Sequence, residues 1–244
     1  MSQSAPALPI AAEPTVSFEG DFAVLSLGAG EGRFSGESIA ALNSCLDEVE
    51  SSAALALITT ADSKIWSNGF DTGWLAAHPD AAAATMVATE KLFARVLTFP
   101  MPTVAALGGH VFAGGVMLAL SHDLRLMRSD RGFLCLPEVD LGVVFTVGMT
   151  ALLTATMTPA TTHRAMVLGE RFTAADALAA GLISEAVAVD DLPARAREVA
   201  KTLGGRDRAT VAGLKRRVYA NAVAELGASA PDAAMLAALH AATS

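Results

Sequence analysis

In the first two thirds of the chain, short runs of consecutive apolar residues alternate with longer stretches in which apolar residues recur every three to four positions. The short runs predict β-strands, over residues 16–18, 22–27, 54–60, 103–107, 123–127, 132–136 and 183–188. The longer stretches predict α-helices, over residues 37–50, 82–99, 147–157, 161–168 and 174–180. This alternation indicates an α/β fold with a mostly parallel sheet covered by helices.

The last third of the chain has only helical spacing. Helices are predicted there over residues 191–203, 206–226 and 231–242. We therefore expect a flexible N-terminal tail over residues 1–14, an α/β core over 15–188 and a helical C-terminal region over 189–244. Within the core, residues 61–74 are predicted to form a loop, and a glycine-rich turn is predicted to lead into a short buried helix near Gly114.

Composition narrows the classes of function. A chain of 244 residues with 52% hydrophobic and 17% charged residues is not disordered, and it has apolar surface to bury beyond its own core, often in an oligomer interface. The net charge of -8 argues against nucleic acid or an anionic membrane as a partner. The uncharged segment 141–162 contains several threonines and a proline, so we expect a buried helix and no membrane span.

The two cysteines, Cys45 and Cys135, lie in apolar stretches and form no framework of pairs. They are expected to be reduced, as in a cytosolic protein. The first residues lack the basic region of a signal peptide, so we expect a cytoplasmic location. No spacing of cysteine, histidine and carboxylate residues is typical of a metal site, and no metal is expected.

The segment 101–142 carries the candidate chemistry. Gly114 and Gly115 let the backbone approach another group closely, and the free N–H groups of the helix that follows can stabilise an anion. Glu138 is an isolated carboxylate among apolar neighbours, which would raise its pKa and suit it to act as a base. Two simpler explanations remain open: tight packing for glycines such as Gly109 and Gly115, and a surface ion pair for Glu138.

Three segments together resemble the crotonase (enoyl-CoA hydratase/isomerase) superfamily: LITTADSKIWSNGFDTGWL, the whole of PMPTVAALGGHVFAGGVMLALSHDLRLMRSDRGFLCLPEVDLG, and GERFTAADALAAGLISEAV. They occur in the family's order and spacing. The motifs SNGFD and PEVDLG are most similar to those of Δ3,Δ2-enoyl-CoA isomerases of the plant and peroxisomal type. The resemblance implies a crotonase-like fold, a spiral of ββα repeats with a helical C-terminal region for oligomerisation.

The resemblance also implies roles for individual residues. In this family the thioester carbonyl of an acyl-CoA lies between two backbone N–H groups, which correspond here to those of Phe70 and Gly114. Such donors stabilise an enolate oxygen, and each is worth about 2.7–4 kcal/mol where it has been measured. Glu138 corresponds to the catalytic glutamate.

Position 117 separates two reactions. Hydratases of this family use two glutamates, and the first corresponds to Met117, which cannot transfer a proton. The resemblance therefore implies an isomerase, in which Glu138 alone takes a proton from C2 of a 3-enoyl-CoA and returns it to C4. Two alternatives stay open: an enoyl-CoA hydratase that positions its water in another way, and a non-catalytic acyl-CoA-binding protein.

The same comparison implies the substrate contacts. They are assigned to Ser67, Asn68, Gly69, Asp71, Trp74 and Pro137. Trp74, Leu75, Phe145 and Met149 are candidates for the acyl-chain wall, or else ordinary residues of the core. Asp71 is expected to shape its loop by accepting hydrogen bonds from backbone N–H groups. Lys64 and the run Lys215-Arg216-Arg217 are candidates for the CoA phosphates, or else parts of solvated surfaces.

The other polar residues nearby are expected to be structural. Asp140, His110 and His122 are given no catalytic role, because a buried histidine with satisfied hydrogen bonds is common. Coenzyme A would arrive as part of the substrate, so no separate cofactor is expected. The family resemblance implies a homotrimer or a hexamer.

Overall fold

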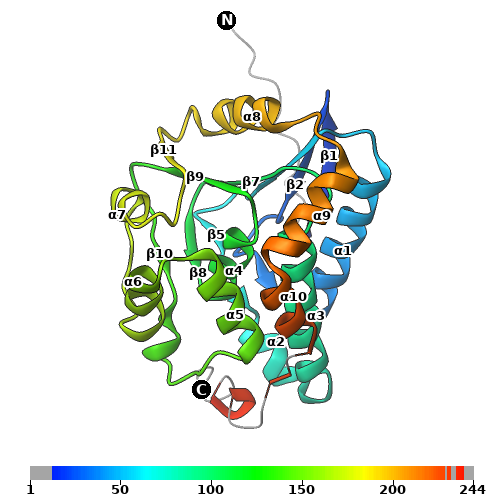
Figure 1. Ribbon diagram of the computed structural model, residues 1–244. Coiled ribbons are helices and arrows are strands. Elements are labelled where there is room, and N and C mark those ends of the chain that lie inside the picture. The colour runs from blue at the N-terminus through cyan, green and yellow to red at the C-terminus, as the bar shows by residue number, and fades with distance from the viewer. Residues whose placement is uncertain (1–12, 229, 232–234, 239–244) are drawn as a thin grey trace, which may run out of the picture.

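The computed structural model describes residues 13–228, 230–231 and 235–238 (Figure 1). Its main sheet has six strands in the order β1-β2-β4-β7-β9-β11, with β1 antiparallel to β2 and the other pairs parallel. These strands are β1 (Thr15–Glu19), β2 (Phe22–Ser26), β4 (Ala56–Thr60), β7 (Thr103–Leu107), β9 (Leu124–Arg128) and β11 (Glu185–Val187). The α/β class and the mostly parallel sheet predicted from the alternation are thus confirmed.

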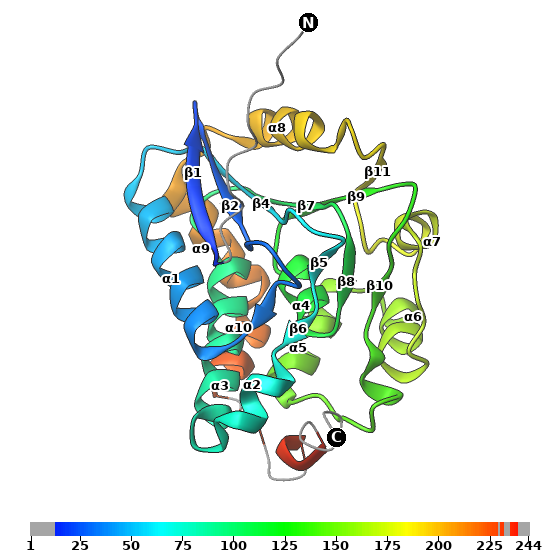
Figure 2. The same ribbon diagram turned by 180° about the vertical axis from the view of Figure 1, so that it is seen from behind.

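Residues on the central strands alternate between two buried layers, as the twofold period of a strand requires. Ile58 and Val104 face the small apolar cluster under α8 (Leu192–Leu203), which crosses one face of the sheet (Figure 2). Leu57 and Leu107 face the main core on the other side. The helices around that core are α1 (Gly36–Ser51), α3 (Pro79–Leu97), α4 (Gly114–Leu120), α5 (Val147–Thr156) and α10 (Ala220–Ala228).

Two further sheets lie beside the main one. One joins β10 (Leu134–Cys135), β8 (His110–Phe112) and β5 (Ile65–Ser67), and the other pairs β3 (Arg33–Phe34) with β6 (Gly69–Phe70), all in parallel. The prediction of a loop over residues 61–74 was therefore wrong, since β5 and β6 lie within it and the helix α2 (Thr72–Ala77) begins near its end. These strands are too short to show a pattern of their own, and partners distant in the sequence stabilise them.

The remaining elements refine the predicted helices. They are a 3-10 turn over Pro137–Val139, α6 (Pro159–Thr162) with a π-helical turn over His163–Val167, α7 (Ala174–Ala179) and α9 (Arg208–Val218). The single helix predicted over 206–226 is two helices that meet at Tyr219, whose ψ of 21° ends α9. α3 begins three residues before the predicted start, with Pro79 in its first turn, a position that proline favours.

The C-terminal helices pack on the core. α10 lies against α5 and α3, and α8 lies against the central strands. Most of the helix predicted over 231–242 and of the tail predicted over 1–14 falls outside the described residues, although 235–238 are helical. The boundary placed at residue 188 stays a prediction. Among the described helices, none is both long and apolar enough to cross a bilayer.

Candidate active site

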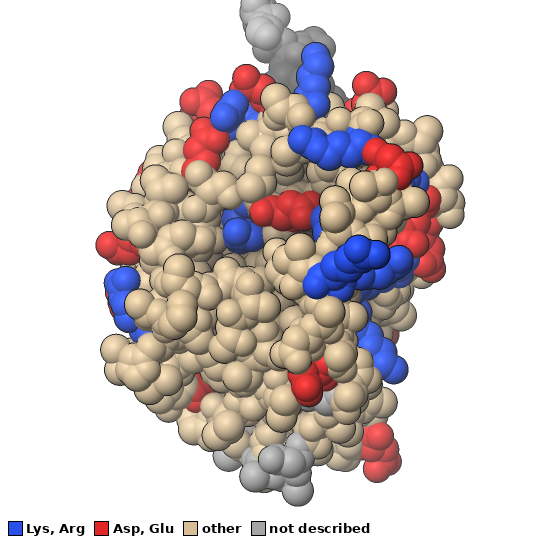
Figure 3. Space-filling model, viewed as in Figure 1, with Lys and Arg blue, Asp and Glu red and all other residues tan. Residues whose placement is uncertain are grey.

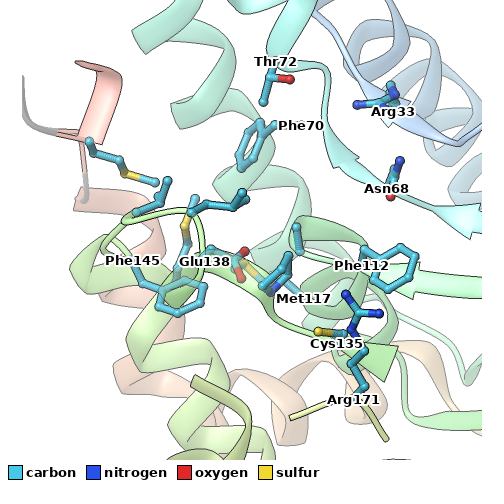
Figure 4. A pocket seen from close by; sticks show the side chains of 16 residues that line it. Arg33, Asn68, Phe70, Thr72, Phe112, Met117, Cys135, Glu138, Phe145 and Arg171 are labelled. Carbon is cyan, nitrogen blue, oxygen red and sulfur yellow. The ribbon is translucent and has the colours of Figure 1, made fainter. Parts of the chain in front are cut away.

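The candidate site is a pocket of about 310 Å³ between β6, the start of α4 and the segment that begins with Pro137 (Figure 4). Its two sides differ in character. Arg33, Asn68 and Arg171 lie on one side, and Phe145 lies on the other with Glu138 between them. A long ligand with one anionic and one apolar end would match this polarity.

Glu138 is held on a short 3-10 turn that Pro137 begins, since the proline ring fixes φ at a value this turn needs. The backbone oxygen of Glu138 accepts a hydrogen bond of 2.9 Å from the N–H of Val143, which closes the loop behind the side chain. Glu138 is only 7% exposed, and its Oε2 has no hydrogen-bond partner among the described residues. No described residue forms an ion pair with Glu138, so the surface ion pair considered for this residue is not seen among them.

Burial governs the protonation of this carboxyl. Loss of solvent around the charged form raises the pKa of Glu138 to about 8, and a backbone hydrogen bond opposes the shift only in part. A carboxyl with a pKa near the working pH can both remove and return a proton. Among the described residues that line the pocket, Glu138 is the only acid.

Two backbone segments meet beside this carboxyl. Gly69 has a φ of +74°, and a Cβ on it would lie 2.5 Å from the amide nitrogen of Gly114 and 3.1 Å from the Cβ of Ala113. A Cβ on Gly114 would in turn lie 3.2 Å from the ring of Phe34. Glycine at both positions therefore lets β6 approach the first turn of α4, where helical N–H groups have no partner within the helix.

Ala113, which precedes that turn, has a φ of 50° and a ψ of -127°. This conformation is costly for a residue with a Cβ, and such strain persists only where the surrounding structure enforces it. Here the Ala113 N–H donates to the Cys135 oxygen at 3.0 Å, and the Ala113 oxygen accepts from Val116 at 2.9 Å. The strained residue fixes the direction in which α4 leaves the pocket.

Several of the predicted site residues lie at this pocket. Asn68, Phe70 and Pro137 line it, as do Phe145 and Met149. Met117 lies in the wall and is 1% exposed, so an apolar side chain occupies the position expected for the first of the two glutamates of hydratases.

Other predicted residues do not line the pocket but form contacts that hold the segment 67–75 in place. The Ser67 hydroxyl donates to the Gly32 oxygen at 2.7 Å and accepts from the Gly69 N–H at 3.2 Å. Asp71 caps α2 by accepting from the Trp74 N–H at 2.9 Å. Trp74 stacks on the imidazole of His78, with ring centroids 4.2 Å apart, and neither Trp74 nor Leu75 lines the pocket.

The basic residues predicted for the CoA phosphates lie elsewhere. Lys215 makes an ion pair of 2.6 Å with Asp123 and is largely buried. Arg216, Arg217 and Lys64 are exposed, and none of them lines the pocket. The cations that line the pocket are Arg33 and Arg171. Arg33 makes an ion pair of 2.6 Å with Glu31. Arg171 contacts the thiol of Cys135, and burial raises the pKa of that thiol.

His110, His122 and Asp140 do not line the pocket. His122 is buried between the Leu118 oxygen and the Thr59 hydroxyl, each 2.8 Å away, and burial lowers its pKa to about 4. His110 stacks on Phe112, and Asp140 is exposed. No cluster of three potential metal-binding side chains occurs among the described residues.

Comparison with known proteins places this arrangement in context. The family model described as enoyl-CoA hydratase/isomerase matches residues 32–241. The peroxisomal enoyl-CoA delta isomerase 2 of Arabidopsis thaliana is 38% identical over 182 residues, which cover 70% of this chain and 76% of that protein. The carnitinyl-CoA dehydratase of Proteus mirabilis is 32% identical over 67% of this chain and 62% of its own length.

Solved structures show the same fold. The apo structure of an enoyl-CoA isomerase from Mycobacterium tuberculosis aligns with a TM-score of 0.82 at 25% identity, covering 94% of this chain and 98% of that one. An enoyl-CoA hydratase of Mycobacterium marinum aligns with a TM-score of 0.81, also at 25% identity, over 93% and 98% of the two chains. The fold expected from the three sequence segments is confirmed.

Proposed function

This chain belongs to the enoyl-CoA hydratase/isomerase family, and from that premise we propose that it is a Δ3,Δ2-enoyl-CoA isomerase. The observation that carries the proposal is a single buried carboxyl, Glu138, in a pocket that Met117 also lines and whose other described lining residues include no acid. Curated relatives named enoyl-CoA delta isomerases support the same reaction.

In the proposed mechanism the thioester oxygen of a 3-enoyl-CoA accepts hydrogen bonds from the N–H groups of Phe70 and Gly114. The Glu138 carboxylate takes a proton from C2, the electron pair of that C–H bond forms a double bond between C1 and C2, and the carbonyl π electrons move onto the thioester oxygen, which carries the negative charge of the dienolate. As the carbonyl re-forms, the C1–C2 pair becomes the C2–C3 double bond and the C3–C4 pair bonds the incoming proton. Glu138 then returns its proton to C4, which leaves the double bond between C2 and C3. One carboxyl suffices because no water is added.

The two ends of the pocket fit the two ends of such a substrate. Coenzyme A is anionic, and Arg33 and Arg171 lie on one side of Glu138. The acyl chain would extend toward Phe145, Met149 and Met235. In this proposal CoA is part of the substrate and no separate cofactor takes part.

The reaction is tested by comparing two substrates. Purified protein is expected to convert 3-hexenoyl-CoA to 2-hexenoyl-CoA much faster than it adds water to crotonyl-CoA, because Met117 cannot activate water. Chromatographic separation of the products measures both rates. Hydration faster than isomerisation would favour the hydratase, and binding of acyl-CoA without either reaction would favour a non-catalytic protein.

We also propose a homo-oligomer, a trimer or a hexamer. Val144, Val147, Leu168 and Val218 are 79%, 65%, 62% and 71% exposed, and much of the surface over α5, α6 and α10 is uncharged (Figure 3). Apolar surface of this kind is typical of an interface. Light scattering should give three or six times the chain mass of 24.9 kDa, and a monomer or a dimer at micromolar concentration would contradict the proposal. A cytoplasmic location stays a prediction.

A further inference from the structure

A second acid, Glu90, lies fully inside the protein on α3, and the mechanism above does not use it. It is 0% exposed, although its neighbours on the buried face of α3 are mostly apolar or small. Burial of a carboxylate costs several kcal/mol unless hydrogen bonds or charges compensate it. The groups that surround Glu90 therefore indicate what it does.

Glu90 meets the first turn of α5. The Thr146 hydroxyl donates to Glu90 Oε1 at 2.8 Å and accepts from the Met149 N–H at 3.1 Å, so it is the N-cap of α5 and also the link to α3. A carboxylate near a helix N-terminus is stabilised by the helix dipole. The hydrogen bond between Thr146 and Glu90 thus favours one placement of this end of α5.

Gly148 makes the approach possible. A Cβ on Gly148 would overlap the Glu90 carboxylate and would lie 2.9 Å from the Cα of Leu226 on α10. Helices α3, α5 and α10 therefore meet around this glycine, and α5 has no room to slide along them. Gly148 is therefore in close contact with both α3 and α10.

The contact between Glu90 and α5 lies next to the side of the pocket that is proposed to bind the acyl chain. Phe145 precedes the Thr146 cap, Met149 follows it within the first turn, and both line the pocket. At the other end of the same segment, Val143 donates to the Glu138 oxygen at 2.9 Å. The wall between Glu138 and α5 is therefore fixed at two points, by the 3-10 turn and by Glu90.

We propose that Glu90 is a positioning residue that holds the Phe145–Met149 wall in place and so determines the affinity for acyl chains longer than four carbons. The inference rests on the proposed function, because it takes the ligand to be an acyl-CoA. A butanoyl chain ends near Glu138, whereas an octanoyl chain has four more carbons to place against the wall. Movement of the wall should therefore affect the two ligands unequally.

The test measures the dissociation constants of butanoyl-CoA and octanoyl-CoA by calorimetry for Glu90→Gln and Thr146→Val. Thr146→Val keeps the shape of the side chain but removes the hydroxyl that joins Glu90 to α5. In both variants octanoyl-CoA is expected to bind more weakly, by about tenfold in Thr146→Val, the order expected for loss of a hydrogen bond. Butanoyl-CoA should change little, and the pH profile of turnover, which Glu138 governs, should stay in place.

Matched variants separate positioning from general damage. Thr154→Val removes an exposed hydroxyl from the same helix, where it bonds only to its own turn, and it should change neither affinity. Thr146→Ser keeps a hydroxyl and should keep the octanoyl-CoA affinity. An equal loss for both ligands, or unchanged affinities in a folded Thr146→Val protein, would overturn the inference. Failure of the unmodified protein to bind either ligand would count against the proposed function instead.

Discussion

Glu138→Gln is expected to lower isomerase turnover by about 100- to 10,000-fold, the range that a positioned general acid–base contributes. Glutamine fills the same volume but cannot accept the C2 proton. Its binding of acyl-CoA should persist, because the N–H groups of Phe70 and Gly114 and the pocket walls are unchanged. Steady-state rates on 3-hexenoyl-CoA together with calorimetric titration of butanoyl-CoA measure both quantities.

Asp140→Asn is the matched control. Asp140 follows Glu138 by two positions and loses its carboxyl group in the same way on amidation, but it is exposed and does not line the pocket. Turnover should remain close to that of the unmodified protein. If Glu138→Gln kept most of its activity, the base would have to be another group.

The pH dependence gives an independent check on Glu138. Its pKa of about 8 means that the carboxylate form increases as the pH rises toward 8, so kcat/KM of the unmodified protein should rise over this range and then level off.

The stability of the folded protein follows the opposite course. Between the ordinary glutamate pKa of 4.5 and the folded value of about 8, the unfolded chain ionises while the folded chain stays protonated, so the unmodified protein loses stability as the pH rises through this window. Glu138→Gln removes that loss, and its advantage in melting temperature should be larger at pH 9 than at pH 5.

The parts of the site that lie within one continuous motif could be predicted from the sequence. Glycine at position 114, the apolar helix after it and the isolated Glu138 are local features, and each one restricts the backbone or the charge where it stands. Met117 was informative for the same reason, because its distance from Gly114 along the chain places it in the pocket wall.

The parts that depend on partners distant in the sequence could not be predicted. Nothing near Lys215 in the sequence shows that it pairs with Asp123, 92 positions away. Arg171 and Arg33 likewise reach the pocket only because β10 and β6 fold beside it. Glu90 occurs in a helix that otherwise shows an ordinary amphipathic pattern, so its proposed role rests on contacts with Thr146 and Gly148 that the sequence does not show.

Gly69→Ala is expected to lower kcat on 3-hexenoyl-CoA by about 100- to 1,000-fold, the cost measured elsewhere for loss of one oxyanion donor. The φ of +74° at Gly69 is strained for alanine, and the new Cβ would lie 2.5 Å from the Gly114 nitrogen. Either the loop of Phe70 or the start of α4 must move, so the two proposed donors separate.

Gly73→Ala is the control for this change, since it adds the same methyl group four residues further on. A Cβ on Gly73 meets only Asp71 Oδ1, at an ordinary 3.5 Å, and alanine favours the helix that contains it. Its turnover should be unchanged.

Because Gly69→Ala also costs stability, its folded fraction is measured first by thermal unfolding. Its binding of free CoA is then compared with its binding of butanoyl-CoA: separated donors should weaken only the thioester, because free CoA has no carbonyl to place between Phe70 and Gly114. A folded Gly69→Ala protein with full turnover would show that the close approach of these two segments does not stabilise the transition state.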